Sequence, residues 1–339
     1  MDRFEVMRSL LADSRYFKLV CGAGNENAEE VRRLAVVYTL AGANGFDVSA
    51  KPEVVEACGE GIDLACGHAE HFSLEIPVRP FITVSVGMPG DHHVRKAFII
   101  DDCVSCDLCI PVCPTDAIPE SLEIIAERCI GCGNCEAACP PKVAAIRYRH
   151  NAKELGELLP RCIEAGAENI ELHAAVPGED TIIGEWETVN AAQPDNFISM
   201  CLDRFHLSNV QLIERIRAAH AVAGERTIIQ ADGVPMSGGT NDHNTTLQAI
   251  AIADVIQKDL KEKDRSFREL PILLSGGTNG KTAAMAQLCN VPYQGVSIGT
   301  HARGIVKGWV AEEGFEHDLE RIGQALEFAS DLVNRSIAS

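Results

Sequence analysis

Long apolar runs are missing from this sequence. A helix that spans a bilayer needs about 18 or more consecutive apolar residues, and no apolar stretch in the 339 residues reaches that length. Aromatic residues are also scarce, at 5%, yet 46% hydrophobic and 23% charged residues are usual for a globular protein. We therefore expect a globular chain without a membrane span, long enough for one large domain or two ordinary ones.

Basic residues are few relative to acidic ones. The chain has 30 lysines and arginines against 49 aspartates and glutamates, which gives a formal net charge of −19. A surface of this sign repels nucleic-acid phosphates and anionic lipids. The charge argues against nucleic acid as a partner and favours basic protein surfaces, although ordinary solubility explains an acidic surface equally well.

The N-terminal residues lack the apolar core of a secretory signal. Met1–Glu5 already contain acidic side chains, and a strand predicted from Phe17 leaves little space for a transit peptide. We expect a cytoplasmic location, in which cysteine thiols stay reduced.

Eight of the 14 cysteines form two copies of one pattern. Each copy has three cysteines spaced by two residues, then a fourth cysteine after three more residues, then proline. The copies are Cys103, Cys106, Cys109 and Cys113 before Pro114, and Cys129, Cys132, Cys135 and Cys139 before Pro140. This is the spacing of bacterial ferredoxins with two [4Fe–4S] clusters. Zinc sites usually show paired CxxC knuckles with a long spacer, and disulfide frameworks belong to short secreted chains, so both alternatives fit less well.

The fourth cysteine of each copy is predicted to bind the cluster of the other copy, as in two-cluster ferredoxins. The first cluster then has as its ligands Cys103, Cys106, Cys109 and Cys139. The second cluster has as its ligands Cys129, Cys132, Cys135 and Cys113. The proline after each fourth cysteine has a fixed φ and turns the chain away.

Outside the cysteine-rich segment, short apolar runs alternate with helical stretches. The runs are apolar throughout, which is typical of parallel strands covered on both faces. Eight strands are predicted, at residues 17–22, 45–50, 80–86, 169–173, 196–201, 226–231, 271–275 and 295–299. Eight strands with intervening helices predict an α/β protein with a (β/α)8 TIM-like barrel, and an open doubly wound sheet is the alternative.

The cysteine-rich segment interrupts this barrel after the third strand. We expect residues 1–90 to form the first part of the barrel, with strands one to three. Residues 91–150 should form a ferredoxin-like insert with two [4Fe–4S] clusters. Residues 151–339 should form the rest of the barrel, with strands four to eight. The insert should begin near residues 87–94 and end near 149–153. Because it follows the carboxyl end of a strand, it should lie on the C-terminal face of the barrel, where barrel active sites are found.

Polar side chains close several predicted strands and should converge on the barrel mouth. They are Asp47, Lys51, Glu171, His173, Asp203, Asp232 and His301, and a glycine-rich loop lies at 237–244. Any barrel has polar strand ends, because its loops are solvated. We identify no nucleophile–base pair among these groups, so no catalytic residue is predicted.

Glycines after the seventh and eighth strands give a further signal. One loop contains Gly276 and Gly277, and the other begins with Gly299 and Thr300. Loops at these places form the common phosphate site of barrels, because glycine lets backbone N–H groups approach the ligand. The pairing of the two loops resembles that in FMN-binding barrels. A vestigial or purely structural turn is nevertheless the favoured interpretation, with FMN or another phosphate-bearing ligand as the alternative. A Walker A loop is excluded, since Ser275 stands where its first glycine would be.

Six cysteines lie outside the two copies. Four of them are predicted to pack in the core, as buried free cysteines commonly do: Cys21, Cys162, Cys201 and Cys289. Cys58 and Cys66 lie near His68 and His71, but their spacing matches no standard metal motif. A third metal site is therefore not favoured.

The chain resembles the family of light-dependent period proteins, the iron–sulfur input components of the cyanobacterial circadian clock. The resemblance extends over essentially the whole chain. It rests on the two cysteine copies, on the blocks at 170–178 and 230–239, and on the loops after the seventh and eighth strands. The C-terminal blocks carry the assignment, since the cysteine copies alone occur in many redox proteins.

The resemblance implies a regulator that adjusts circadian period to light through the cellular redox state and associates with clock-core and sensor-kinase proteins. The residues alone leave two classes of function open. In the first, a change in cluster redox state alters the shape or the partners of a redox-sensing protein. In the second, the clusters pass electrons to a flavin or substrate at the barrel mouth of an oxidoreductase. Flavin absorption beside that of the clusters would indicate the second class.

Overall fold

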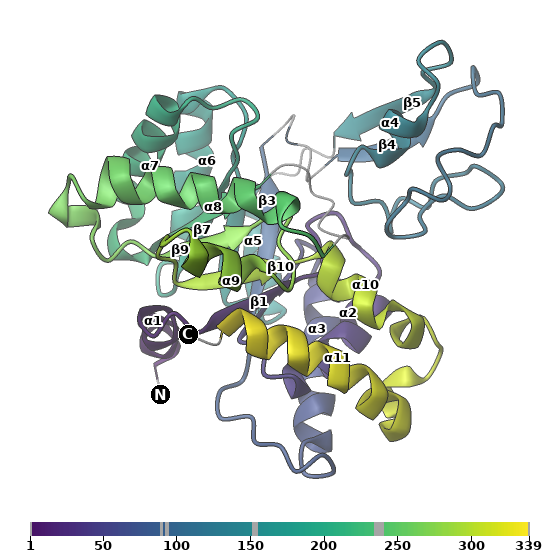
Figure 1. Ribbon diagram of the computed structural model, residues 1–339, viewed down its shortest axis with the longest axis horizontal. Coiled ribbons are helices and arrows are strands. Elements are labelled where there is room, and N and C mark those ends of the chain that lie inside the picture. Colours follow the sequence, from purple (N-terminus) through teal and green to yellow (C-terminus); the bar gives the residue numbers. More distant parts are fainter. Residues whose placement is uncertain (1, 89–90, 92–94, 151–154, 234–240, 338–339) are drawn as a thin grey trace.

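The chain forms a closed barrel of eight parallel strands in the order β1-β10-β9-β8-β7-β6-β3-β2 (Figure 1). The computed structural model describes residues 2–88, 91, 95–150, 155–233 and 241–337. The barrel strands are β1 (Tyr16–Val20), β2 (Gly45–Ser49), β3 (Phe81–Gly87), β6 (Asn169–His173), β7 (Ile198–Leu202), β8 (Thr227–Asp232), β9 (Ile272–Ser275) and β10 (Gly295–Ile298). The predicted barrel is confirmed, and the open-sheet alternative is excluded.

Helices cover the outside of the barrel (Figure 1). They are α2 (Ala28–Leu40), α3 (Pro52–His68), α5 (Leu155–Glu164), α6 (Glu179–Ala192), α7 (Asn209–Ala223), α8 (Asn244–Ile256), α9 (Thr282–Leu288), α10 (Thr300–Val310) and α11 (Leu319–Ile337). Local signals fix several starts: the Asn27 side chain caps α2, Pro52 opens α3, and Ser208 forms a capping box with Gln211 at α7. Among the helices described, none has both the length and the apolar character needed to cross a membrane.

Apolar side chains between the strands and the surrounding helices form the main core. All residues of β2, β6 and β7 are buried, as expected for strands covered on both faces. Trp186 of α6 is fully buried, and its indole N–H donates a hydrogen bond to the carbonyl of Ala219 at 2.9 Å. This bond satisfies the one polar group of a side chain that fills the space between α6 and α7.

A short helix, α1 (Arg3–Ala12), precedes the first strand and was not predicted from the sequence. Met7 of this helix is buried with Phe81 in a second, smaller core. The guanidinium of Arg3 lies 3.7 Å from the centre of the Phe81 ring and pairs with Glu168 at 2.5 Å. Because Phe81 begins β3, the helix closes the N-terminal end of the barrel.

The cysteine-rich insert stands outside the barrel wall (Figure 1). Its strands β4 (Arg95–Ile99) and β5 (Ile146–His150) pair antiparallel, and α4 (Asn134–Ala138) lies between them in the chain. Buried residues of the insert, among them Ala97 and Ile118, give it a small core of its own. It follows β3 in the chain, as predicted. Its boundaries stay a prediction, because residues 89–90, 92–94 and 151–154 lie outside the described residues.

The insert rests against the C-terminal face of the barrel. The backbone N–H of Glu26, in the loop from β1 to α2, donates to the carbonyl of Glu127 at 2.7 Å. Lys307 of α10 pairs with Asp116 of the insert at 2.5 Å. Loops that leave the carboxyl ends of the strands form this face, so the insert lies at the barrel mouth.

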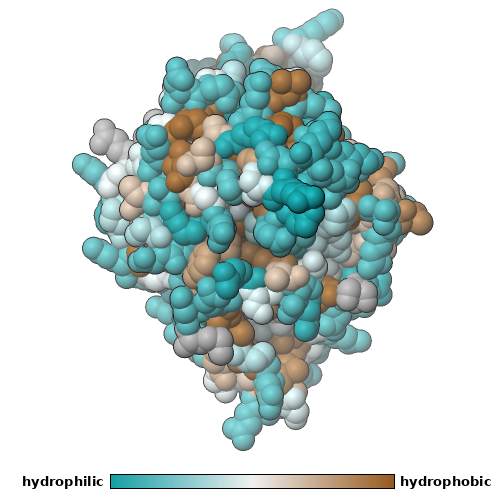
Figure 2. Space-filling model, turned by 90° about the vertical axis from the view of Figure 1, so that its left-hand side faces the viewer, coloured by the Kyte–Doolittle hydropathy of each residue, from teal (hydrophilic) through white to brown (hydrophobic). Residues whose placement is uncertain are grey.

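The side of the molecule at the left of Figure 1 is predominantly polar. Figure 2 shows hydrophilic residues over much of this face, with apolar residues in separate patches between them. This distribution agrees with the large acidic excess of the sequence, a net charge of −19.

Candidate functional site

The insert brings cysteines of the two sequence copies together. A cavity within it is lined by Cys113, Cys129, Cys132 and Cys135, along with apolar side chains such as that of Ile118. Cys113, the fourth cysteine of the first copy, thus lies with the three leading cysteines of the second copy. Crossed cluster ligation requires this grouping.

The remaining four cysteines form the other group. Burial raises the pKa of the Cys109 thiol, and the charges of Cys103, Cys106 and Cys139 raise it further. Cys139, the fourth cysteine of the second copy, therefore lies within electrostatic reach of the first copy. Cys106 of this group is exposed. In the group that contains Cys113, by contrast, Cys129 is buried, so the two groups differ in their access to solvent.

Backbone N–H groups donate hydrogen bonds to thiols in both groups. Four such contacts have donor–sulfur distances of 3.2–3.4 Å: Ser105 to Cys103, Ala145 to Cys139, Ala97 to Cys129 and Ala117 to Cys113. Hydrogen bonds of this kind favour the charged thiolate and are among the features that tune iron–sulfur clusters. The residues of the insert therefore fit iron–sulfur ligation.

The Cys135 thiol keeps its proton until a metal binds. Burial, followed by the charges of Cys132, Cys129 and Cys113, raises the pKa of the Cys135 thiol to about 12. Because the thiolate is the form that ligates iron, metal binding at Cys135 must release this proton.

A buried polar network occupies the barrel interior. Lys18 of β1 is only 2% exposed; its ammonium donates to Glu171 Oε2 at 2.5 Å and lies 3.7 Å from Asp47 Oδ2. Ser85 donates to the other oxygen of Asp47 at 2.5 Å, and Ser199 donates to Glu171 Oε2 at 3.3 Å. Barrel interiors are usually filled by branched apolar side chains. A polar layer at this place is therefore unusual, and it is a candidate functional site.

Lys18 is held as an ammonium. Burial alone lowers the pKa of Lys18, but the carboxylates of Glu171 and Asp47 together raise it above its ordinary value. An amine must lose its proton to act as a Schiff-base nucleophile. The arrangement therefore favours Lys18 as a fixed positive charge rather than as a nucleophile.

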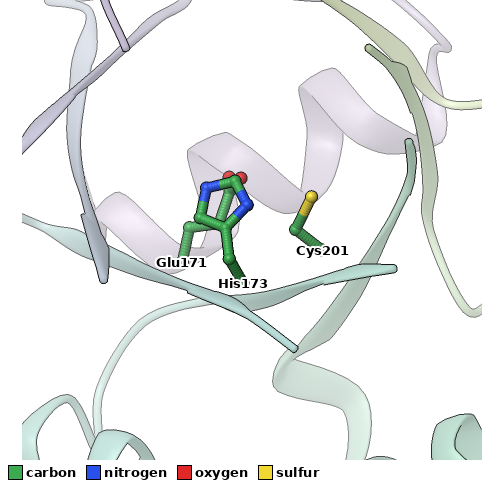
Figure 3. Close-up of side chains that lie close together, drawn as sticks. All are labelled: Glu171, His173 and Cys201. Atoms are coloured by element: carbon green, nitrogen blue, oxygen red, sulfur yellow. The ribbon is translucent and has the colours of Figure 1, made fainter. Parts of the chain in front are cut away.

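Three side chains with metal-ligating atoms lie side by side near this network (Figure 3). Glu171 and His173 are on β6, and Cys201 of β7 pairs in register with His173. Residues two apart on a strand face the same side, so the strand register directs all three side chains into the barrel. Their donor atoms lie within 4.8 Å of one another, and all three residues are buried.

A cavity at the mouth links the barrel interior to the insert. Its lining includes the strand-end residues Asp47, Glu171, His173 and Asp232, the loop residues Gly276, Gly277, Gly299, Thr300 and Arg303, and Ile130 of the insert. The predicted phosphate-loop residues and four of the predicted polar residues therefore meet. The cavity measures about 70 Å³, below the roughly 300 Å³ at which drug-sized ligand pockets begin. The binding of FMN or another phosphate-bearing ligand at these loops stays a prediction.

Three of the predicted polar residues lie outside this cavity. Lys51 pairs with Glu26. Asp203 is buried and accepts a hydrogen bond from the backbone N–H of Phe205 at 2.8 Å. His301 is buried in the first turn of α10. Of the predicted loop at 237–244, residues 237–240 lie outside the described residues.

Two residues of the site were missed or misjudged from the sequence. Lys18 was not singled out, although a lysine within an apolar strand was an available signal. Cys201 is buried as predicted, but it faces polar groups: its Sγ lies 3.2 Å from Asp232 Oδ2. Burial and then the charges of Asp232 and Glu171 raise the pKa of Cys201 well above its ordinary value.

The other scattered cysteines behave differently from one another. Cys21 and Cys162 are buried, as predicted. The prediction for Cys289 is wrong: it is exposed, because it follows the end of α9 on the surface. Cys58 is buried while Cys66 is exposed, so these two thiols do not share one environment.

Gly276 is required by close packing. Its φ is +60°, and an added Cβ would lie 1.9 Å from Asp232 Oδ1 and 2.4 Å from the carbonyl oxygen of Gly233. We expect Gly276→Ala to lower the free energy of unfolding by more than about 1 kcal/mol. The control, Gly308→Ala in α10, has no atom within 4 Å of its added Cβ and should stabilise by about 0.5–1 kcal/mol. Urea denaturation measures both, and equal stabilities would contradict this explanation.

The fold and the cysteine-rich insert together define a (β/α)8 barrel protein with an inserted iron–sulfur-binding domain. The YdjI aldolase from Escherichia coli K12 shares the barrel fold, with a TM-score of 0.50 and 8% sequence identity over 98% of this chain and 97% of that chain. Pyruvate synthase subunit PorD of Methanothermobacter marburgensis is 45% identical over 54 residues, which are 16% of this chain and 67% of that protein.

The chain belongs to the light-dependent period A family. Residues 162–336 match the light-dependent period A C-terminal domain, and residues 101–149 match the Fe–S cluster-binding domain of the same family. Light dependent period A from Synechococcus elongatus is 31% identical over 317 residues, covering 93% of this chain and 85% of that protein. The family resemblance inferred from the sequence is confirmed.

Proposed function

We propose that this protein is an iron–sulfur redox sensor that regulates protein partners, with two [4Fe–4S] clusters in the insert. The observation that carries the proposal is the grouping of the thiols, which joins the fourth cysteine of each copy to the three leading cysteines of the other. When bound, such clusters accept and release single electrons. The chain's own thiols would hold them in two sets: Cys103, Cys106, Cys109 and Cys139, and Cys129, Cys132, Cys135 and Cys113.

The two cysteine groups have different surroundings, which suits a sensor. Cys129 and Cys132 flank Ile130, which lines the barrel cavity. Beside the other group, Val104 and Leu108 are 62% and 51% exposed. One cysteine group therefore borders the barrel cavity, and the other borders an exposed apolar surface.

The exposed surface is suited to a protein partner. We define the outer surface as the exposed apolar residues Val104, Leu108 and Val112 of the insert. Exposed acidic residues lie beside them in the chain, at Asp101, Asp102 and Asp107. Exposed apolar groups ringed by charge are typical of protein-binding sites, and the negative charge favours a basic partner.

Family membership supports a particular setting for this regulation. The family resemblance implies adjustment of circadian period to light, with clock-core and sensor-kinase proteins as the partners. The proposed partner of the outer surface is therefore a sensor kinase or a core clock protein with a basic contact region.

Partner affinity is expected to change with cluster oxidation state. A tenfold change in the dissociation constant needs only about 1.4 kcal/mol of differential binding. The measurement is an anaerobic binding titration of reduced and oxidised protein against the sensor kinase. Equal dissociation constants in the two states would contradict the proposal.

The outer surface supplies the matched control for that titration. Leu108→Ser should weaken partner binding about tenfold with both clusters intact, because it removes an exposed apolar contact. Leu288→Ser, at an 81% exposed leucine of α9 far along the chain, should leave the dissociation constant unchanged. Equal effects of the two changes would show that the outer surface is not the contact.

A second candidate function is an oxidoreductase that works at the barrel mouth. Its supporting observation is Ile130, which places a neighbour of two cluster cysteines in the wall of the mouth cavity. Thr300→Ala separates the two functions. In a regulator it should leave partner binding intact, whereas in an oxidoreductase it should sharply reduce electron transfer to a small molecule at the cavity.

A further inference from the structure

We propose that Glu171, His173 and Cys201 form a mononuclear zinc site at the barrel mouth, distinct from the cysteine groups of the insert. The three residues come from two adjacent strands, β6 and β7, and are all buried. Figure 3 shows the His173 ring beside the Glu171 carboxylate, with the Cys201 side chain next to them on the neighbouring strand.

The spacing of two donor atoms matches that of neighbouring ligands on one metal ion. His173 Nε2 lies 3.4 Å from Glu171 Oε1. Two ligands bound at about 2.1 Å to a tetrahedral zinc ion are themselves about 3.4 Å apart. The carboxylate oxygen and the imidazole nitrogen therefore need little movement to bind the same ion.

The other oxygen of Glu171 is held by outer partners. Glu171 Oε2 accepts hydrogen bonds from Lys18 at 2.5 Å and from Ser199 at 3.3 Å. Zinc ligands are commonly oriented in this way by hydrogen bonds from residues behind them. Lys18 bonds to Glu171 Oε2, whereas His173 lies beside Glu171 Oε1. The carboxylate therefore stands between the Lys18 ammonium and the proposed ion.

The donor set favours zinc over harder cations. Magnesium and calcium bind oxygen ligands, whereas a set of one thiolate, one imidazole and one carboxylate suits zinc. Carboxylates of Asp47 and Asp232 line the same cavity and add negative charge near a cation. Asp232 Oδ2 lies 3.2 Å from Cys201 Sγ, so one of these carboxylates lies directly beside a proposed ligand.

The experiment uses the full-length protein purified under argon with its clusters in place. After treatment with a chelator, the protein is equilibrated with Zn²⁺, and zinc and iron are counted by mass spectrometry. We expect about one zinc ion per chain at a site of this kind, and X-ray absorption at the zinc edge should show one sulfur at about 2.3 Å with nitrogen and oxygen at about 2.0–2.2 Å. Absence of bound zinc, or a shell of three or four sulfurs, would overturn the proposal.

Variants test whether the named residues are the ligands. Cys201→Ser and His173→Gln should each weaken zinc binding at least tenfold, while Cys162→Ser, at another buried cysteine, in α5, should leave it unchanged. Wild-type zinc affinity in both ligand variants would also overturn the site. If a ligand variant fails to fold, the absorption spectrum of the wild-type zinc protein still decides the question. Iron counts in the same samples separate failure of this site from failure of the proposed clusters.

Discussion

Replacing Cys139 with serine is expected to lower the iron content from about eight to about four atoms per chain, because one [4Fe–4S] cluster loses a ligand and the other keeps its full set. The charge of Cys139 acts on the Cys109 thiol together with the charges of Cys103 and Cys106, which groups the Cys139 thiol with the first sequence copy. Anaerobic reconstitution followed by iron and sulfide analysis measures the loss. Cys162→Ser, at a buried thiol outside the insert, should keep all of the iron.

Pairs of substitutions show which cluster has been lost. With crossed ligation, Cys139→Ser combined with Cys103→Ser damages one cluster and should still leave about four irons, whereas Cys139→Ser combined with Cys129→Ser damages both. Ligation within each copy predicts the reverse order. Zinc in place of iron at the insert, with no acid-labile sulfide, would contradict both schemes.

Lys18→Met is expected to lower the free energy of unfolding by about 3–5 kcal/mol, the usual cost of removing one partner from a buried ion pair. The change leaves Glu171 and Asp47 buried without the ammonium that lies 2.5 Å and 3.7 Å from them. Denaturation followed by circular dichroism, without added zinc, measures the loss. Because the folded-state pKa of Lys18 is raised, its stabilising contribution is complete at neutral pH and disappears only as pH rises through that raised value.

Two further variants isolate the buried charge as the cause. Adding Glu171→Gln to Lys18→Met removes one of the two carboxylates and should restore part of the lost stability. Lys258→Met removes a lysine from an exposed pair with Asp254 of α8, so it should leave the free energy of unfolding nearly unchanged. A Lys18 variant as stable as the Lys258 variant would refute the explanation.

The barrel strands were predictable because their sequence pattern depends on burial alone. A strand between a packed interior and outer helices is apolar along its whole length, so residues 169–173 were predicted with the bounds that the structure shows. The helix at Asn209–Ala223 has a different local signal, since Ser208 and Gln211 cap its start. Helix α1 was not, because what stabilises it is contact with the barrel end, as in the packing of Met7 against Phe81.

The candidate sites also differ in how far the sequence alone could predict them. Ligand spacing within one short segment is a property of the sequence, so the cysteines of the insert were evident before the structure. The trio of Glu171, His173 and Cys201 depends on the register between β6 and β7, which no local pattern encodes. The position of Ile130 in the cavity wall depends on how the insert docks, and an isolated isoleucine carries no signal of that.

The antiparallel pairing of β4 with β5 bears on how the insert is joined to the barrel. The register runs from Arg95 opposite His150 to Ile99 opposite Ile146, so the polypeptide enters and leaves the insert at neighbouring points. A unit whose ends already meet can be spliced into a surface loop at little entropic cost to its host. The barrel and the insert each have a hydrophobic core of their own, so a small iron–sulfur domain is accommodated in the chain without disturbing the packing of the barrel.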